Sequence, residues 1–364
     1  MSKDPVSVYG FINAKLRAKI GLMRQSRIIE DLLKAASLVE AVSVLRDSPY
    51  HALAEAYDQT GDLQQMEYVL LEMEIAMYRE VASYLEGKSA TFVNHLLGKI
   101  EVDNLKNSIR LWYSSIIRGR PIRYRSGYLY KQTILHPIDW TAMVNATGWE
   151  TLLKALGHSP YEGILKEYTE QDLQKDGLFS LESKLDGFWY EHMLSGIQTL
   201  SRQDREVASA IFAVEVDLKN LLTLARYGWY HRMEGSALRT LLLPWGKVAE
   251  SKETERYIQA PVDDRDPVAL INRFAGGLEQ DSPFVQRGSI HSEETSVLEN
   301  LKIEDYLEKR RHALYRKMLS SDPFTIALAL SYFFLNKEES SMIKAILNGK
   351  YYGYDEAYIR GVIG

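Results

Sequence analysis

Apolar side chains recur along most of this chain at the spacing of an α-helix. Ile28, Leu32 and Ala36, for example, follow one another at four-residue intervals, which places them on one helical face. Strict alternation of apolar and polar residues, the pattern of a strand, is scarce. Only residues 122–130 and 257–262, where aromatic and branched residues cluster near prolines, are candidates for strands. The pattern therefore predicts an all-α protein.

A Ser-Pro-aromatic motif occurs three times at a long interval. The copies are Ser48-Pro49-Tyr50, Ser159-Pro160-Tyr161 and Ser282-Pro283-Phe284, and their prolines are 111 (160 − 49) and 123 (283 − 160) residues apart. Serine is a common N-cap and proline is well tolerated at the first helical position. Each copy therefore predicts the start of a helix, and in the second copy Glu162 completes a capping-box pattern.

A second motif follows each Ser-Pro copy. Glu101-Val102-Asp103 begins 52 residues after Pro49, and Glu215-Val216-Asp217 begins 55 residues after Pro160. The third copy is expected at Glu339, 56 residues after Pro283, although its Val-Asp is missing. A basic residue and several aromatics come next in each case. These equivalences predict that Glu101, Glu215, Glu339, Arg110 and Arg226 are interface residues at corresponding places of a repeat.

The repeat of about 115 residues is longer than a solenoid unit, whose period is roughly 20 to 50 residues. Each copy is therefore expected to be a small helical domain. The predicted domains are residues 1–128, 129–236 and 237–364. The third is predicted to carry an exposed, charged insertion near 250–267, where acidic and basic residues dominate.

Composition narrows the class of protein. A hydrophobic content of 46% is sufficient for a core, and 44 basic against 49 acidic residues leave no strong field for nucleic acid or anionic lipid. The absence of cysteine excludes disulfides and thiolate metal sites. The opening residues lack the apolar core of a signal peptide, and the longest apolar stretch, 324–335, is shorter than the roughly 20 residues of a membrane span. A cytoplasmic protein, soluble or held at a membrane by another protein, is expected.

Patterns that carry catalytic chemistry are incomplete. Gly87-Lys88-Ser89 matches the end of a P-loop, but Ala82 stands where the loop requires glycine. The histidines do not form the two-histidine, one-glutamate pattern of zinc hydrolases. Paired carboxylates such as Glu72 and Glu74 are typical of solvated helix faces. We therefore expect no catalytic residue, cofactor, metal site or small-molecule substrate.

One basic segment, residues 118–125, alternates arginine with aromatic and apolar residues. Such a segment could grip single-stranded RNA through phosphate contacts and base stacking. Because the chain as a whole is slightly acidic, we favour a linker that pairs with the acidic surface of a neighbouring protein, and expect no nucleic-acid partner.

With its opening segment Tyr9–Ala18, its three Ser-Pro-aromatic copies and its three Glu-x-x-x-apolar copies, the chain resembles the C subunit of bacterial and archaeal V/A-type ATPases, called the d subunit in eukaryotes. The resemblance implies a funnel of three similar helical domains around a pseudo-threefold axis, without nucleotide binding. It further implies a non-catalytic rotor subunit, peripheral on the cytoplasmic face of the membrane. Its partners would be the central-shaft subunits D and F and the membrane proteolipid ring, between which it would transmit torque and so couple ATP turnover to ion translocation.

Two other readings of the sequence stay open. One is a helical scaffold or adaptor subunit of a different multiprotein complex, and the other is an enzyme with a non-standard site. For Glu101 and Glu215 the alternative role is structural, as charge near a helix N-terminus or as an ion pair such as that of Glu215 with Lys219.

Overall fold

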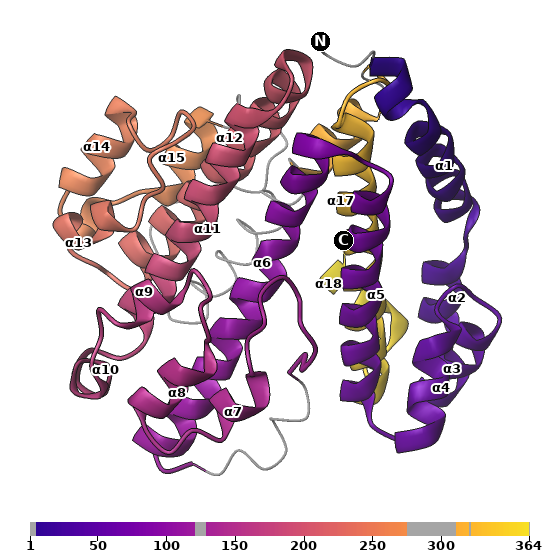
Figure 1. Ribbon diagram of the computed structural model, residues 1–364, viewed down its shortest axis with the longest axis horizontal. Coiled ribbons are helices and arrows are strands. Elements are labelled where there is room, and N and C mark those ends of the chain that lie inside the picture. Colours follow the sequence, from indigo (N-terminus) through magenta and orange to yellow (C-terminus); the bar gives the residue numbers. More distant parts are fainter. Residues whose placement is uncertain (1–4, 121–128, 275–310, 320–321, 364) are drawn as a thin grey trace. The chain divides into compact units, whose positions relative to one another are not determined.

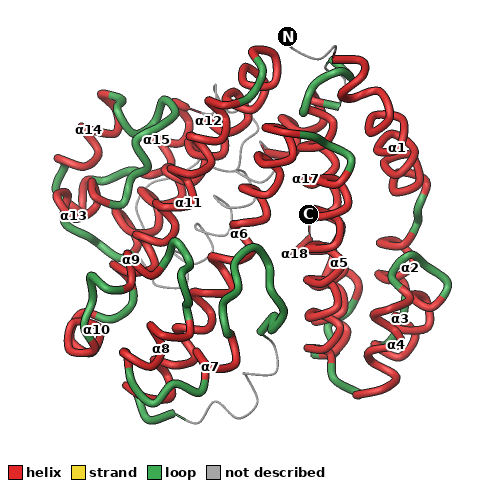
Figure 2. The backbone as a smooth tube through the Cα atoms, in the orientation of Figure 1, coloured by secondary structure: helices red, strands yellow, loops and turns green. Residues whose placement is uncertain are grey.

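The computed structural model describes residues 5–120, 129–274, 311–319 and 322–363. Within these ranges every regular element is a helix, which confirms the predicted all-α class (Figure 2). Residues 257–262, a candidate strand, instead complete helix α14 and enter a short 3-10 turn. Most of the other candidate strand, the greater part of the basic segment and the third Ser-Pro motif lie outside the described residues.

The chain forms two compact units, Met1–Leu200 with Pro323–Gly364, and Ser201–Asp322. The first unit combines parts of all three predicted domains, so the division at residues 128 and 236 stays a prediction. Its helices are α1 (Pro5–Gln25), α2 (Ile28–Lys34), α3 (Leu38–Arg46), α4 (His51–Thr60), α5 (Leu63–Ser83), α6 (Gly87–Trp112), π-helix η1 (Tyr113–Ile117), α7 (Trp140–Val144), α8 (Trp149–Ala155), α9 (Glu162–Leu165), α10 (Glu170–Asp176), α11 (Phe179–Thr199), α17 (Ala327–Tyr351) and α18 (Glu356–Ile363) (Figure 1).

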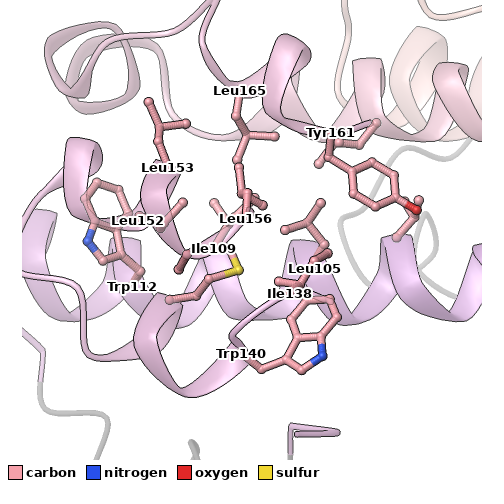
Figure 3. Close-up of a cluster of buried hydrophobic side chains, with 14 of the residues drawn as sticks. Leu105, Ile109, Trp112, Ile138, Trp140, Leu152, Leu153, Leu156, Tyr161 and Leu165 are labelled. Atoms are coloured by element: carbon pink, nitrogen blue, oxygen red, sulfur yellow. The ribbon is translucent and has the colours of Figure 1, made fainter. Parts of the chain in front are cut away.

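Helix α6 carries a hydrophobic core of the first unit. Leu105, Ile109 and Trp112 recur every three to four residues and are buried on one face of α6. The short helices α7, α8 and α9 cover this face with a second set of buried side chains, among them Trp140, Leu152, Leu156 and Leu165 (Figure 3). These helices are too short to be stable alone, so their burial against α6 is what holds them.

Another core joins the N-terminal and C-terminal parts of the chain. Ile343, Ile346 and Leu347 of α17 pack into one cluster with residues of α2 to α5 such as Leu32 and Leu53. At its edge the Lys350 ammonium donates a buried hydrogen bond of 2.7 Å to the Leu33 carbonyl. The first and last parts of the sequence therefore fold as one body.

Helices α3 and α8 show the internal repeat most directly. Both precede a Ser-Pro-Tyr motif, and Ala41 and Leu45 of α3 correspond to Leu152 and Leu156 in and just after α8, each 111 residues later and each fully buried. A short helix follows the motif in both places. Duplication therefore extends from the sequence motif to the packing.

The predicted capping role of Ser-Pro is wrong in the two copies that the structure describes. The helices that follow begin at His51 and Glu162, whose N–H groups bind the backbone carbonyls of Ser48 and Ser159 rather than a serine hydroxyl. Glu162 does not form a capping box, since its carboxylate pairs with Lys166 at 2.7 Å. In both places the motif forms a turn that directly precedes the first residue of the helix.

The second unit contains α12 (Arg202–Thr223), π-helix η3 (Leu224–Tyr230), α13 (Gly235–Thr240), α14 (Lys252–Gln259), 3-10 helix η4 (Val262–Asp264) and α15 (Pro267–Phe274). Its core gathers apolar residues of α12 and η3 against those of α13 to α15, including Leu221, Leu224, Leu238 and Leu270. The order of elements is the same as in the first unit: α12, like α6, is a long helix followed by a π-helix and then by several short helices.

The charged stretch 250–267 is exposed only in part, and its being an insertion in the third copy stays a prediction. Most of it forms α14, which is capped by Ser251, whose hydroxyl accepts from the Thr254 N–H at 3.0 Å. Tyr257 and Ile258 are buried. Arg265 is also buried, and its guanidinium donates to four backbone carbonyls, those of Gly228, Met233, Ile258 and Ala260. The charges of α14 lie on its outer face.

Candidate functional site

Glu101 is fully buried in the middle of α6, where a carboxylate requires several donors. Its Oε2 accepts from the N–H groups of Leu135 and His136 at 2.7 and 2.8 Å, and its Oε1 accepts from the Tyr161 hydroxyl at 2.9 Å. Oε1 also lies 2.5 Å from His136 Nδ1. The carboxylate therefore fixes the segment before α7 and the Ser-Pro-Tyr motif to the long helix.

Asn104, one turn further along α6, adds a second anchor. Its side-chain amide donates to the Tyr130 carbonyl at 2.9 Å and accepts from the Tyr130 N–H at 3.1 Å. Both partners are buried. The amide thus replaces the two hydrogen bonds that this backbone would otherwise make to a strand or to water.

The same two anchors recur on α12. Asp217 accepts from the N–H groups of Lys247 and Val248 at 2.7 and 2.8 Å. Asn220 exchanges two hydrogen bonds with the Leu243 backbone, at 3.0 and 2.9 Å. Both residues stand 116 positions after their counterparts in α6 (217 − 101 and 220 − 104). The counterpart of Glu101 is therefore Asp217, and the predicted equivalence with Glu215 is two residues out of register.

A glycine makes room for the Asp217 anchor. Gly246 has a φ of 77°, and a Cβ at this position would lie 2.1 Å from Asp217 Oδ1. No other residue type allows the backbone to approach the carboxylate this closely in that conformation.

Glu339 of α17 occupies the third equivalent place and meets the first Ser-Pro-Tyr motif. Its carboxylate is hydrogen-bonded to the Tyr50 hydroxyl. Burial raises the pKa of Glu339, and the Tyr50 hydroxyl opposes this rise only in part. Burial and the adjacent carboxylate raise the pKa of Tyr50 as well, and the same two causes raise the pKa of Tyr161 beside Glu101.

These two tyrosine contacts connect successive copies of the repeat. Tyr161 of the second copy binds Glu101 of the first, and Tyr50 of the first copy binds Glu339 of the third. The junction from the third copy to the first thus has the chemistry of the junction from the first to the second.

The remaining predicted site residues lie nearer the surface. Arg110 is about half exposed and makes two hydrogen bonds of 2.6 Å to Glu182. Arg226 is exposed in η3. Glu215 pairs with Arg311 at 3.0 Å. The structure therefore brings Glu101 and Glu339 into the interior and leaves Arg110 and Arg226 at the ends of long helices.

Exposed aromatic side chains gather where α17 ends. Tyr351, Tyr352, Tyr354 and Tyr358, here called the tyrosine cluster, are each about half exposed or more, and neighbouring rings lie 4.5 to 6.3 Å apart. Helices α6 and α12 are each followed by a π-helix, an element that is common at functional sites, and Tyr230 of η3 is exposed. Large exposed aromatics are typical of protein interfaces.

The family model described as ATP synthase (C/AC39) subunit matches residues 12–362. The chain belongs to this family. An A-type ATP synthase C subunit of Methanococcoides burtonii is 22% identical over 97% of this chain and 93% of the relative. The corresponding proteins of Pyrococcus furiosus and Halobacterium salinarum are 22% and 23% identical, over 93% and 99% of this chain and 85% and 98% of the relatives.

Family membership makes this C/AC39 chain a component of an A/V-type ATP synthase complex, structural and not itself catalytic. Across the described ranges no helix is both long and apolar enough to span a membrane. The same residues include no group of three or more acidic or histidine side chains placed to hold a metal ion.

We expect Asn104→Ala to lower the free energy of unfolding by about 2 to 4 kcal/mol, because it leaves the buried Tyr130 N–H and carbonyl without partners. Urea unfolding followed by circular dichroism measures the change. Asn107→Ala, at an exposed position on the same helix, is the matched control and should change stability by less than about 0.5 kcal/mol. Equal effects of the two substitutions would contradict the anchor.

The raised pKa of Glu339 predicts a pH dependence of stability. Its folded-state pKa lies above the unfolded value of about 4.3, so its contribution to stability is complete below that pH and is lost as pH rises through the folded pKa. Glu339→Gln removes this loss while keeping an acceptor for Tyr50. The variant should therefore be at least as stable as the parent at pH 7.

Urea midpoints measured from pH 4 to pH 8 test this expectation. Glu150→Gln, on the exposed face of α8, controls for the change of net charge. A Glu339→Gln profile that runs parallel to that of the parent chain across this range would contradict it.

Proposed function

We propose that this protein is the rotor coupler of a V/A-type ATPase, placed on the cytoplasmic face between shaft subunits D and F and the membrane proteolipid ring. In this role it turns with the rotor and transmits torque between ATP turnover and ion translocation. Three observations support the proposal in addition to family membership.

The observation that carries the proposal is the equivalence of two junctions between copies. A chain of three copies can close into a ring only when its last copy binds its first as the first binds its second. Tyr50 and Glu339 supply that third-to-first contact with the same residue types as Tyr161 and Glu101. The equivalence supports the funnel around a pseudo-threefold axis, with the three predicted domains as its walls.

The polar anchors support a mechanical role. Charge-assisted hydrogen bonds are among the stronger ones in proteins, and a buried network holds its partners in one geometry. Glu101 and Asn104 fix 129–161 to α6 at several points of one helix. A force applied to the short helices would therefore be transmitted to α6 through these hydrogen bonds, without a flexible segment between them.

The exposed groups define where partners would bind. Glu101 and Glu339 are occupied within the fold, so we assign the contacts with shaft or ring to the exposed ends of the long helices. These ends carry Arg110, Arg226 and the tyrosine cluster. Glu215, paired with Arg311, lies closer to the surface than Glu101 and stays a candidate for the same interface.

Reconstituted vesicles test the coupling role. Complexes that lack this chain should hydrolyse ATP without pumping ions, and adding the chain back should restore pumping. An adaptor of a different complex would not restore it. Ion pumping at full rate without the chain would overturn the proposal.

The tyrosine cluster gives a sharper prediction. Replacing Tyr351, Tyr352 and Tyr354 together by serine should lower the ratio of ions pumped to ATP hydrolysed several-fold, because three exposed rings are lost from the interface. Phe179→Ser, which removes an exposed ring of α11, is the control and should leave the ratio unchanged. Circular dichroism confirms that both variants fold, and an unchanged ratio in the triple variant would remove the cluster from the interface.

A further inference from the structure

Helix α1 has an apolar face on each side. Tyr9, Ile12, Leu16 and Ile20 form the inner face and are buried in contact with the rest of the first unit. Phe11, Ala14, Ala18 and Leu22 follow one another at three- and four-residue intervals on the opposite side, and all four are exposed. Phe11 and Leu22 expose 68% and 69% of their surface. This second set, the outer face of α1, extends over about three turns.

The outer face has cations on both sides and no acid. The helix contains Lys15, Lys19, Arg17 and Arg24 but no aspartate or glutamate. Lys15 and Lys19 lie along one side of the outer face and pair with Glu80 of α5. Arg17 and Arg24 lie along the other side and are exposed. An occupant of this face would therefore meet the positive charge of two exposed arginines.

From this chemistry we infer that the outer face of α1 binds an acidic amphipathic helix of a partner protein. The apolar positions have the spacing of one helix packed along another. Ala14 and Ala18 at the centre allow close approach, and Phe11 and Leu22 enclose them at both ends. Acidic residues beside the partner's apolar positions would pair with Arg17 and Arg24, which suit bidentate contacts with carboxylates.

Two other occupants fit less well. A membrane surface favours bulky residues along the whole apolar face, and two of the four positions here are alanine. A second copy of this chain would place arginine against arginine. The inference concerns one helix face and stands whether or not the rotor proposal is correct.

Site-specific cross-linking tests the inference. Because the sequence contains no cysteine, Ala18→Cys gives this chain a single attachment point for a benzophenone maleimide, which is attached before the chain is assembled into the ATPase complex. We expect photolysis to join α1 to one partner segment that is acidic and has apolar residues at helical spacing. Gln171→Cys, exposed on α10, is the control and should not yield that product. Cross-links only to lipid, only to another part of this chain, or to a segment without acidic residues would overturn the inference.

Charge reversal gives an independent measurement on the same complex. Arg17→Glu with Arg24→Glu should weaken the cross-link to that segment at least tenfold, whereas lysine at both positions should largely preserve it. Lys154→Glu with Lys175→Glu changes the net charge equally at exposed positions on α8 and α10. Equal cross-linking in the two glutamate variants would overturn the inference, and because the readout is not ion pumping, it can fail while the coupling role holds.

Discussion

A carboxylate buried in the middle of a long helix must be satisfied by donors from elsewhere in the chain, and the first unit is organised around this constraint. Glu101 has no exposed surface. Its hydrogen-bond partners lie 34 to 60 residues later in the sequence. Meeting that requirement fixes the path of the chain from Leu135 to Tyr161. The same path places the apolar residues of α7, α8 and α9 over Leu105 and Ile109, so the polar anchor and the apolar core specify one arrangement.

Duplication has preserved this hydrogen-bond chemistry more faithfully than the residues. On α12 a shorter aspartate does the work of glutamate, and Gly246 brings the backbone close enough for it. On α17 the asparagine is absent, yet Glu339 still meets a tyrosine of a Ser-Pro motif. What recurs is an acidic acceptor on a long helix with donors from the next copy. The last copy finds its donor in the first.

The charged and aromatic groups divide into two classes with different consequences. Those inside the fold, such as Glu101 and Asn104, set the geometry and are unavailable to partners. Those at the ends of the long helices and along the outer face of α1 are held by a rigid framework but leave their surfaces open. For a structural component of an ATP synthase this division is useful, because stiffness and adhesion are then supplied by different residues.

The sequence by itself determined the helical class, the triplicated motifs and the family, because periodic burial and local turn chemistry are written in neighbouring residues. It did not determine the register of the repeat. Sequence identity of the motif paired Glu101 with Glu215. A shift of two residues, however, turns a side chain by about 200° around a helix. It is Asp217 that faces the backbone N–H groups of Lys247 and Val248 and accepts their hydrogen bonds. Composition likewise predicted an exposed stretch at 250–267, whereas Tyr257, Ile258 and Arg265 are buried by contacts with residues about 20 to 40 positions earlier in the sequence. Tertiary structure decided these points, because which side of a helix is buried depends on what packs against it.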